Sequence, residues 1–414
     1  MVQIVVEEAK RCLQCKKPLC KEGCPVNTPF NEVVKLLLEG NIMKAGEMLF
    51  DNNPLSVVCS LVCPHEKQCQ GHCVLGRKGD PIKVGAVENY VSDYYLNFIS
   101  PELKKDKNKR AAIIGSGPAG ITIAIILAAK GYDITIFEAH DKIGGVLRYG
   151  IPSFRIDKSI LEKLKDKLIA MGIKIRPNTL IGQDITIDDL FRDEYKAIFI
   201  GTGVWKSKSL GIKGESLGHV HYAIDYLKNP EVYNLGKKVC VIGAGNVAMD
   251  VARTALRNGV REVYIMARRG PENITAEKVE IESAKFDGVK FEYYKAPIEI
   301  LDEGVKYVET KVIDEEGTRG KLVMLEDTEN IFKADSVIIA SGQGPRDNIV
   351  STTNGIEVNK GGLVAVDECG HTTREGVFAS GDVVTGAKTV VEAVRLSKIV
   401  ADAMDRYVCE KLEK

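Results

Sequence analysis

Eight of the eleven cysteines lie between Cys12 and Cys73, and their spacing limits what this chain can fold into more than any other feature. They form two runs, C-x2-C-x4-C-x3-C-P over residues 12–25 and C-x3-C-x5-C-x3-C over residues 59–73. Bacterial ferredoxins bind iron–sulfur clusters with a C-x2-C-x2-C-x3-C-P run whose last cysteine serves the other cluster. The first run here is longer in its middle loop but keeps the Cys-Pro ending. Eight thiols at these spacings predict two [4Fe–4S] clusters.

Zinc and disulfide bonds are the alternatives for such a segment. C-x2-C is also half of a zinc knuckle, but the second run contains no such pair. The N-terminus lacks the segments of a signal peptide, and the longest apolar run, residues 121–129, is shorter than the roughly 20 residues that span a bilayer. We therefore expect a cytoplasmic protein with no membrane partner, in a reducing compartment that favours metal ligands over disulfides. Lys and Arg total 57, as do Asp and Glu, so we expect no nucleic-acid partner either.

Two later stretches have the strand, glycine-rich turn, helix and strand pattern of a parallel sheet. The first predicts a strand at 111–115, a helix at 118–130 and a strand at 133–138. The second predicts a strand at 238–243, a helix at 247–258 and a strand at 262–267. The charged stretch before them, residues 102–110 after Pro101, is typical of a surface linker.

The first glycine-rich turn has the G-x-G-x-x-G fingerprint of dinucleotide-binding sites, in the required place between a strand and a helix. Its residues are Gly115, Ser116, Gly117, Pro118, Ala119 and Gly120. The first glycine allows the tight turn, and the second lets the backbone approach a pyrophosphate at the helix N-terminus. Glu138 ends the next strand, where its carboxylate can accept hydrogen bonds from ribose hydroxyls. This stretch predicts a dinucleotide site.

A distant segment identifies the first nucleotide as FAD. Gly381 and Asp382 follow an apolar strand at 377–379, and a helix is expected from about Thr389. An Asp at such a turn can bond the ribityl hydroxyls, and the following helix N-terminus can face the N1/O2 edge of a flavin. The alternative for Asp382 is a simple turn or helix cap. Lys388 could add positive charge at the flavin or be an ordinary surface lysine.

The second glycine-rich turn predicts a nicotinamide site. Its residues are Gly243, Ala244, Gly245, Asn246 and Val247. The second strand of this unit ends in Arg268 and Arg269 instead of an acid. Guanidinium groups match a 2′-phosphate, which favours NADP(H) over NAD(H); the alternative is a solvated basic pair.

These observations predict an α/β fold class with an α-helical N-terminal iron–sulfur domain and two Rossmann-like dinucleotide-binding domains, the second inserted into the first. The expected boundaries are 1–107 for the domain with two [4Fe–4S] clusters, 108–235 and 336–414 for the FAD-binding domain, and 236–335 for the NAD(P)H-binding domain.

The chain resembles the glutamate synthase small-subunit family, which also includes the N-terminal half of dihydropyrimidine dehydrogenase and the large subunit of ferredoxin–NADP transhydrogenase. The matching segments are the eight-cysteine pattern, GSGPAG at 115–120, GGVLRYGIPSFR at 144–155, GAGNVAMDVARTALR at 243–257 and GDVVTGAKTVVEAV at 381–394. The segment NITA at 273–276 departs from members that carry Pro or another Arg there, which weakens the preference for NADP over NAD.

The resemblance implies a division of the ligands that spacing alone does not give. It assigns one cluster to Cys12, Cys15, Cys20 and Cys73, and the other to Cys24, Cys63, Cys69 and Glu88. Cys59, which spacing would have chosen, then binds no iron. The resemblance also implies FAD contacts at Glu138, Gly145, Val146 and Arg155, and nicotinamide-domain contacts at Ala340, Ser341 and Gly342.

The expected function is that of an NAD(P)H-dependent flavin and iron–sulfur oxidoreductase subunit, in which the cofactors, and no catalytic side chain, carry the chemistry. It would pass electrons between NADPH and a partner through FAD and the clusters. The resemblance implies a glutamate synthase large-subunit-like partner. The alternatives are electron input to an FMN-bearing dihydropyrimidine dehydrogenase, or to a bifurcating oxidoreductase with a flavin reductase-like subunit or ferredoxin. A non-catalytic redox sensor is a rival of another class, disfavoured by the intact nicotinamide motif.

Overall fold

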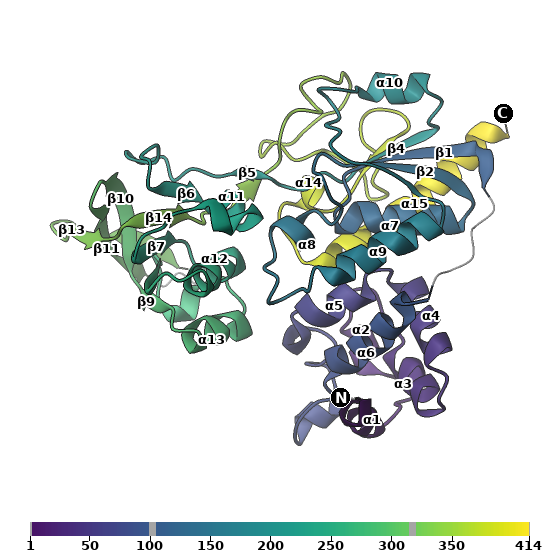
Figure 1. The fold of residues 1–414 in the computed structure, drawn as a ribbon, viewed down its shortest axis with the longest axis horizontal. Helices are drawn as coiled ribbons and strands as arrows, with labels where there is room; N and C mark the ends of the chain where they lie inside the picture. The colour runs from purple at the N-terminus through teal and green to yellow at the C-terminus, as the bar shows by residue number, and fades with distance from the viewer. Residues whose placement is uncertain (1, 99–104, 314–319, 414) are drawn as a thin grey trace. The chain divides into compact units, whose positions relative to one another are not determined.

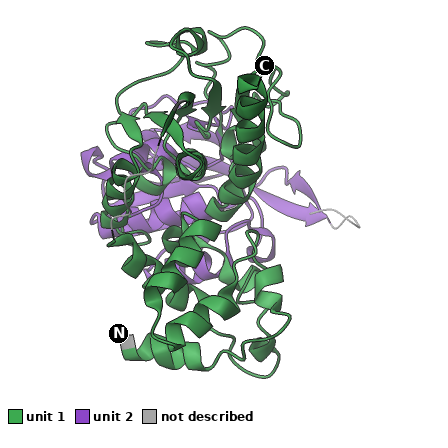
Figure 2. Ribbon diagram, turned by 90° about the vertical axis from the view of Figure 1, so that its right-hand side faces the viewer, with its two compact units in different colours: residues 1–148, 153–204, 344–414 green, residues 149–152, 205–343 purple. Residues whose placement is uncertain are grey.

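The structure is a computed structural model that describes residues 2–98, 105–313 and 320–413. It contains two compact units, which Figure 2 distinguishes by colour. One unit comprises residues 1–148, 153–204 and 344–414, and the other comprises residues 149–152 and 205–343. Residues 102–104 of the expected linker lie outside the described part of the chain.

The cysteine-rich part of the first unit is helical, as expected (Figure 1). Its α-helices are α1 (Val2–Lys10), α2 (Leu19–Glu22), α3 (Phe30–Leu38), α4 (Ile42–Asn52), α5 (Ser56–Val62) and α6 (Val84–Leu96), with short 3₁₀ helices η1 (His65–Lys67) and η2 (Val74–Arg77). Apolar side chains at helical spacing, such as Phe30, Val33 and Leu37 of α3, are buried against α4 and α6. The cysteine loops lie between these helices and are held by this small core.

The rest of the first unit is built on a five-stranded parallel sheet in the order β16-β4-β1-β2-β3. The strands are β1 (Asp106–Ile114), β2 (Tyr132–Phe137), β3 (Lys174–Arg176), β4 (Ala197–Ile200) and β16 (Val377–Ala379). Its helices are α7 (Pro118–Ala129), α8 (Val146–Tyr149), α9 (Ser159–Ala170), α10 (Ile187–Arg192), α14 (Asp382–Thr385) and α15 (Val390–Leu412). The C-terminal segment thus returns to add strand β16 beside β4, and α15 packs against α7.

The expected start of the first strand, at residue 111, is wrong. Strand β1 begins at Asp106, whose backbone N–H donates to the carbonyl oxygen of Gly131 at 2.8 Å. Lys105 and Arg110 form ion pairs with Asp133 at the start of β2. Within residues 106–110, Arg110 pairs with Asp133 and Lys109 pairs with Asp405 of α15, so this part of the expected linker belongs to the sheet.

The second unit contains a five-stranded parallel sheet, in the order β6-β14-β7-β8-β9, and an antiparallel sheet. The parallel strands are β6 (Val220–Tyr222), β7 (Lys238–Ile242), β8 (Glu262–Met266), β9 (Lys290–Glu292) and β14 (Ser336–Ile339). The antiparallel strands are β10 (Lys295–Leu301), β11 (Gly304–Ile313), β12 (Lys321–Met324) and β13 (Asn330–Lys333), and β5 (Lys206–Ser207) pairs with β15 (Gln343–Gly344). The helices are α11 (Ala223–Lys228), α12 (Asn246–Arg257), α13 (Lys278–Phe286), η3 (Pro230–Val232) and η4 (Pro271–Asn273).

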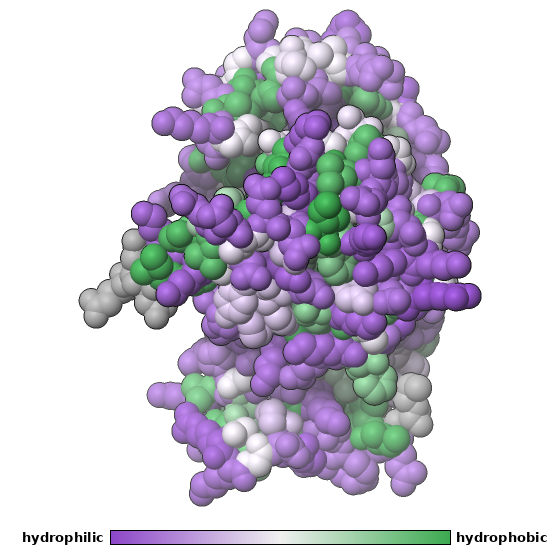
Figure 3. All heavy atoms as spheres, turned by 90° about the vertical axis from the view of Figure 1, so that its left-hand side faces the viewer, coloured by the Kyte–Doolittle hydropathy of each residue, from purple (hydrophilic) through white to green (hydrophobic). Residues whose placement is uncertain are grey.

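Hydrophilic residues cover most of the face drawn in Figure 3, and hydrophobic ones occur there in small separate groups. In the part of the chain that the structure describes, no helix is both long enough and apolar enough to cross a membrane.

Candidate iron–sulfur, flavin and nicotinamide sites

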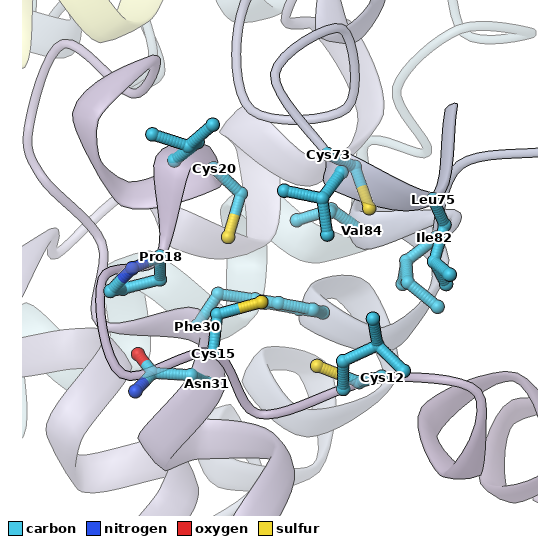
Figure 4. Close-up of a pocket in the computed structure, with 13 residues that line it drawn as sticks. Cys12, Cys15, Pro18, Cys20, Phe30, Asn31, Cys73, Leu75, Ile82 and Val84 are labelled. Atoms are coloured by element: carbon cyan, nitrogen blue, oxygen red, sulfur yellow. The ribbon is translucent and has the colours of Figure 1, made fainter. Parts of the chain in front are cut away.

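Four cysteines of the first expected cluster, Cys12, Cys15, Cys20 and Cys73, line one pocket. Figure 4 shows their sulfur atoms around its hollow, with Phe30 and Val84 among the apolar lining residues. Cys12 and Cys15 reach it from one tight loop in which Gln14 has a φ of 47°. Cys73 directly precedes η2. Residues 61 positions apart in the sequence thus share one pocket.

The thiols of this pocket affect one another's charge. Burial, together with repulsion from Cys12 and Cys73, raises the pKa of Cys20 to about 11. Burial likewise raises the pKa of Cys12, with Cys15 and Cys73 adding to the shift. Thiolates so close together need a cationic centre to be stable, and iron supplies it by deprotonating coordinating thiols outright. Soft sulfur donors around a hollow, in an apolar shell, fit an iron–sulfur cluster.

A second group forms around Glu88, which is 6% exposed on α6. A hydrogen bond with Cys59, then burial and the negative charges of Cys59, Glu88 and Cys69, raise the pKa of Cys63. Burial, Glu88 and Cys24 raise that of Cys69. Cys63, Cys69 and Glu88 therefore lie within electrostatic reach of one another, and Cys24, the fourth expected ligand of the second cluster, lies within reach of Cys69.

The two candidates for the fourth ligand of this cluster, Glu88 and Cys59, both lie near Cys63. Burial raises the pKa of Glu88 to about 8, so the site disfavours its charge unless a cation is bound. Cys59 lies one helical turn before Cys63 on α5, where the Cys63 N–H donates to the Cys59 carbonyl at 3.0 Å. The donor set fits a cluster with either residue as the fourth ligand.

The flavin fingerprint has the close backbone approaches that its glycines require. A Cβ on Gly120 would lie 1.9 Å from the carbonyl oxygen of Gly115, whose φ is +96°. A Cβ on Gly117, at the N-cap of α7, would meet only the Cα of Gly145, at 4.0 Å. The open space at Gly117 fits the cradle that the fingerprint predicts for a pyrophosphate at this helix N-terminus.

The distant flavin segment lies against this turn. A Cβ on Gly381 would be 3.0 Å from that of Ala119, and Gly381 has a φ of +75° before α14. Burial raises the pKa of Asp382 to about 6, against the opposing effects of Lys388. The Lys388 backbone N–H donates to Asp382 Oδ1 at 3.1 Å, whereas its side chain is exposed. Thr389 caps α15 by accepting a hydrogen bond from the N–H of Glu392 at 3.4 Å.

The remaining flavin residues occupy two neighbouring loops. Gly145 has a φ of +51° and leads into α8 at Val146, and Arg155 is half-buried in the turn before α9. Glu138 is buried, and burial raises its pKa, but hydrogen bonds from His140 and Ser116 outweigh that effect and hold the pKa below its usual value. Sequence reasoning missed His140. Its position two residues after the acid was the available signal.

The nicotinamide turn in the second unit repeats this design. Gly243 has a φ of +131°, and a Cβ there would lie 2.4 Å from the carbonyl oxygen of Ala340. Gly245 is the N-cap of α12, and Ala248 is fully buried in the position of the third glycine. Asn246 Oδ1 accepts a 2.8 Å hydrogen bond from the N–H of Glu277, a contact that the sequence did not predict.

The basic pair and the segment after β14 lie in the same unit. Arg268 is exposed, whereas Arg269 is half-buried and its Nη2 donates to the carbonyl oxygen of Gly320 at 3.1 Å. Ser341 Oγ donates to the Lys208 carbonyl at 2.5 Å, and Gly342 has a φ of +113°. These residues leave the α12 N-terminus and one guanidinium exposed for a phosphorylated nucleotide.

Two protein-family models match this chain. Residues 109–396 match the family model of the pyridine nucleotide-disulphide oxidoreductases, and residues 2–98 match dihydropyrimidine dehydrogenase domain II with its 4Fe-4S cluster. The glutamate synthase [NADPH] small chains of Halomonas elongata and Escherichia coli are 34% and 32% identical. The matches cover 95% and 97% of this chain and 88% and 91% of those proteins.

The solved structure of Mycobacterium tuberculosis FprA in complex with NADPH has a similar fold. It aligns with a TM-score of 0.62 at 18% identity, over 74% of this chain and 86% of FprA. The expectation of two Rossmann-like domains behind a 4Fe–4S domain is confirmed. The chain belongs to the glutamate synthase small-chain family of FAD-containing, NAD(P)H-dependent oxidoreductases with an N-terminal 4Fe–4S domain.

Proposed function

We propose that this chain is the electron-input subunit of a larger enzyme, which takes electrons from NADPH and delivers them to a glutamate synthase large-subunit-like partner. Bound FAD can exchange two electrons with a nicotinamide and single electrons with iron–sulfur clusters. The observation that supports this role is the shared unit: the cysteine-rich helices and the flavin turns pack within one compact body.

Each part of the chain has a binding role in this proposal. The proposed binding ranges are 1–107 for two [4Fe–4S] clusters, 108–235 and 336–414 for FAD, and 236–335 for NADPH. The second compact unit of the structure, residues 149–152 and 205–343, is wider than the last of these ranges. The amides after Gly117 and Gly245 bind the two pyrophosphates at helix N-termini, and Arg268 binds the 2′-phosphate. Glu138 orients the flavin-side ribose through the carboxylate that Ser116 and His140 hold in place.

The pocket of Cys12, Cys15, Cys20 and Cys73 is the proposed exit toward the partner. Leu13, which lines this pocket, is 63% exposed. A large apolar side chain exposed beside a redox centre suits a contact with another protein. The relatives' names as small chains support a partner subunit, and the thiolate ligands support a cytoplasmic, reducing location.

Anaerobic reduction of the purified, cofactor-loaded protein with NADPH tests the proposal. We expect the flavin absorbance to bleach and the signal of reduced clusters to appear in the EPR spectrum. A Cys20→Ser variant should still bleach its flavin but lose part of the cluster signal. Flavin bleaching without any cluster signal, even after full titration, would contradict the proposed electron path.

The partner requires a second experiment. Anaerobic affinity purification, followed by cofactor analysis of the captured protein, should recover a glutamate synthase large-subunit-like chain. Capture of an FMN-bearing pyrimidine dehydrogenase subunit or of a second flavin reductase would replace that partner. NADPH-dependent dye reduction distinguishes all three enzymes from a sensor, because a sensor with loaded cofactors would reduce no dye.

A further inference from the structure

A chain of hydrogen bonds connects the last helix of the flavin-binding part to Cys24. Lys398 Nζ, on α15, donates to Asn52 at the end of α4: to its carbonyl oxygen at 2.7 Å and to Oδ1 at 3.2 Å. Asn52 Nδ2 in turn donates to Thr28 Oγ1 at 3.4 Å. Thr28 Oγ1 lies 3.3 Å from Cys24 Sγ. All four residues belong to the first unit.

The donors in this chain all point the same way. The ammonium of Lys398 can only donate, so the Asn52 atom beside it is the oxygen and the amide NH₂ faces Thr28. Thr28 Oγ1 therefore accepts from Asn52, and its own hydrogen is directed to the sulfur. A Cys24 thiolate has no hydrogen and can only accept this bond. Each hydrogen bond polarises the next, so this series of bonds presents partial positive charge to Cys24.

The surroundings make this polarisation effective. Thr28 is 5% exposed, and Lys398 is half-buried. Burial lowers the pKa of Lys398, and negative charge at Cys24 and Asp402 opposes that shift. Charges interact more strongly in such a site than in water, because the effective dielectric constant is lower.

The hydrogen-bond chain starts at Lys398 on α15, the helix whose N-terminus belongs to the proposed flavin site. Helix α15 begins at Val390, directly after its cap Thr389, and Lys398 lies eight residues further on. At 1.5 Å per residue, that is roughly 12 Å along the helix. One rigid element therefore connects the flavin turn to the surroundings of Cys24.

We propose that Lys398, Asn52 and Thr28 are positioning residues that raise the reduction potential of the cluster bound by Cys24, so that this cluster is the one that accepts electrons from the flavin. The inference rests on the proposed role of Cys24 as a ligand. Reduction adds negative charge to a cluster, and hydrogen bonds to its sulfurs stabilise that charge.

EPR-monitored redox titration of the cofactor-loaded protein tests this inference. Lys398→Met and Thr28→Val should each lower the midpoint potential of one cluster only. We expect about a tenfold change in its one-electron equilibrium constant, which corresponds to about 59 mV. Thr28→Ser keeps the hydroxyl and should restore the potential. Lys163→Met is the matched control, because Lys163 of α9 bonds Asp93 of α6 at 2.7 Å and is not part of the hydrogen-bond chain to Cys24.

The double variant Lys398→Met, Thr28→Val distinguishes an effect transmitted through the hydrogen bonds from the effect of a distant charge. If the bonds transmit the effect, Lys398→Met should change the potential much less in the Thr28→Val background than alone, because the link is already broken. If the potential shifts of the two variants add, the hydrogen bonds do not transmit the effect. The charge of Lys398 would then act on the cluster through space. Unchanged potentials, with only a lower melting temperature, would show that Lys398 merely anchors α15 to α4.

Failure of the proposed function would look different from failure of this inference. If iron and sulfide analysis finds no cluster in the wild-type protein, the iron–sulfur assignment itself is wrong. If the clusters are present and the variants titrate like wild type, only the tuning role is wrong. Should Lys398→Met lose its iron, Thr28→Val and Thr28→Ser decide the outcome alone.

Discussion

The backbone N–H of Ser116 donates a 2.9 Å hydrogen bond to Glu138 Oε2, which ties the flavin fingerprint to the acid that directly follows strand β2. On the other side of the carboxylate, the N–H of His140 donates to Oε1 at 2.8 Å. One buried carboxylate therefore fixes both the pyrophosphate turn and the loop after β2. Its charge supports the fold as well as the proposed ribose contact.

Glu138→Gln should lower stability and flavin affinity together. A carboxamide has one acceptor oxygen, so its NH₂ would face the donors of Ser116 or His140, at a cost of about 1–3 kcal/mol. Thermal unfolding at pH 7, with flavin retention measured by fluorescence, checks this. The exposed Glu326→Gln is the control and should unfold like wild type.

The same variant has a defined pH dependence. The pKa of Glu138 is lower in the folded protein than its ordinary value of 4.5, so its stabilisation is complete above that pH. It is lost as the pH falls through the folded-state pKa. The difference in melting temperature between wild type and Glu138→Gln should therefore shrink below pH 4.5. A constant difference down to the acid unfolding of the protein would contradict a charged Glu138.

Two glycines of the fingerprint should separate flavin binding from folding. A Cβ on Gly117 meets nothing closer than 4.0 Å, so Gly117→Ala should fold normally and lose flavin, since the methyl group fills the pyrophosphate cradle. A Cβ on Gly120 would lie 1.9 Å from a backbone oxygen, so Gly120→Ala should misfold. Circular dichroism and bound flavin per chain measure the two effects. Full flavin content in Gly117→Ala would disprove the cradle.

Variants around Cys63 should identify the fourth ligand of the second cluster. We expect Cys59→Ser to keep all of its iron and Cys63→Ser to lose about half, if two [4Fe–4S] clusters are bound. Glu88→Gln should keep its iron but shift the potential of one cluster, because ligand charge sets that potential. Iron analysis and EPR titration provide both readouts. Loss of half the iron in Cys59→Ser would make Cys59 the ligand.

The sequence predicted the local patterns of this fold well. The second βαβ unit lies within one residue of its expected bounds at each end, because glycine turns and apolar periodicity are local signals. The antiparallel strands β10 to β13 were not predicted. The bond between Lys398 and Asn52 could not be predicted either, since 346 residues separate the two positions. Contacts of that range depend on how helices pack, which spacing does not encode.

The two arginines after β8 should differ in what they contribute to nucleotide choice. Arg269 donates to the Gly320 carbonyl, so Arg269→Ala removes a structural bond, whereas Arg268 is exposed and its guanidinium is available to a 2′-phosphate. A hydrogen bond between charged groups contributes about 1.5–3 kcal/mol, so Arg268→Ala should raise the KM for NADPH by roughly tenfold or more. The KM for NADH should hardly change, because NADH carries no 2′-phosphate. Steady-state dye reduction with both nucleotides measures this, and Arg261→Ala, on the exposed residue before β8, is the control. An equal rise in the KM for NADPH and for NADH would show that Arg268 does not recognise the 2′-phosphate. It would favour NAD(H) as the nucleotide.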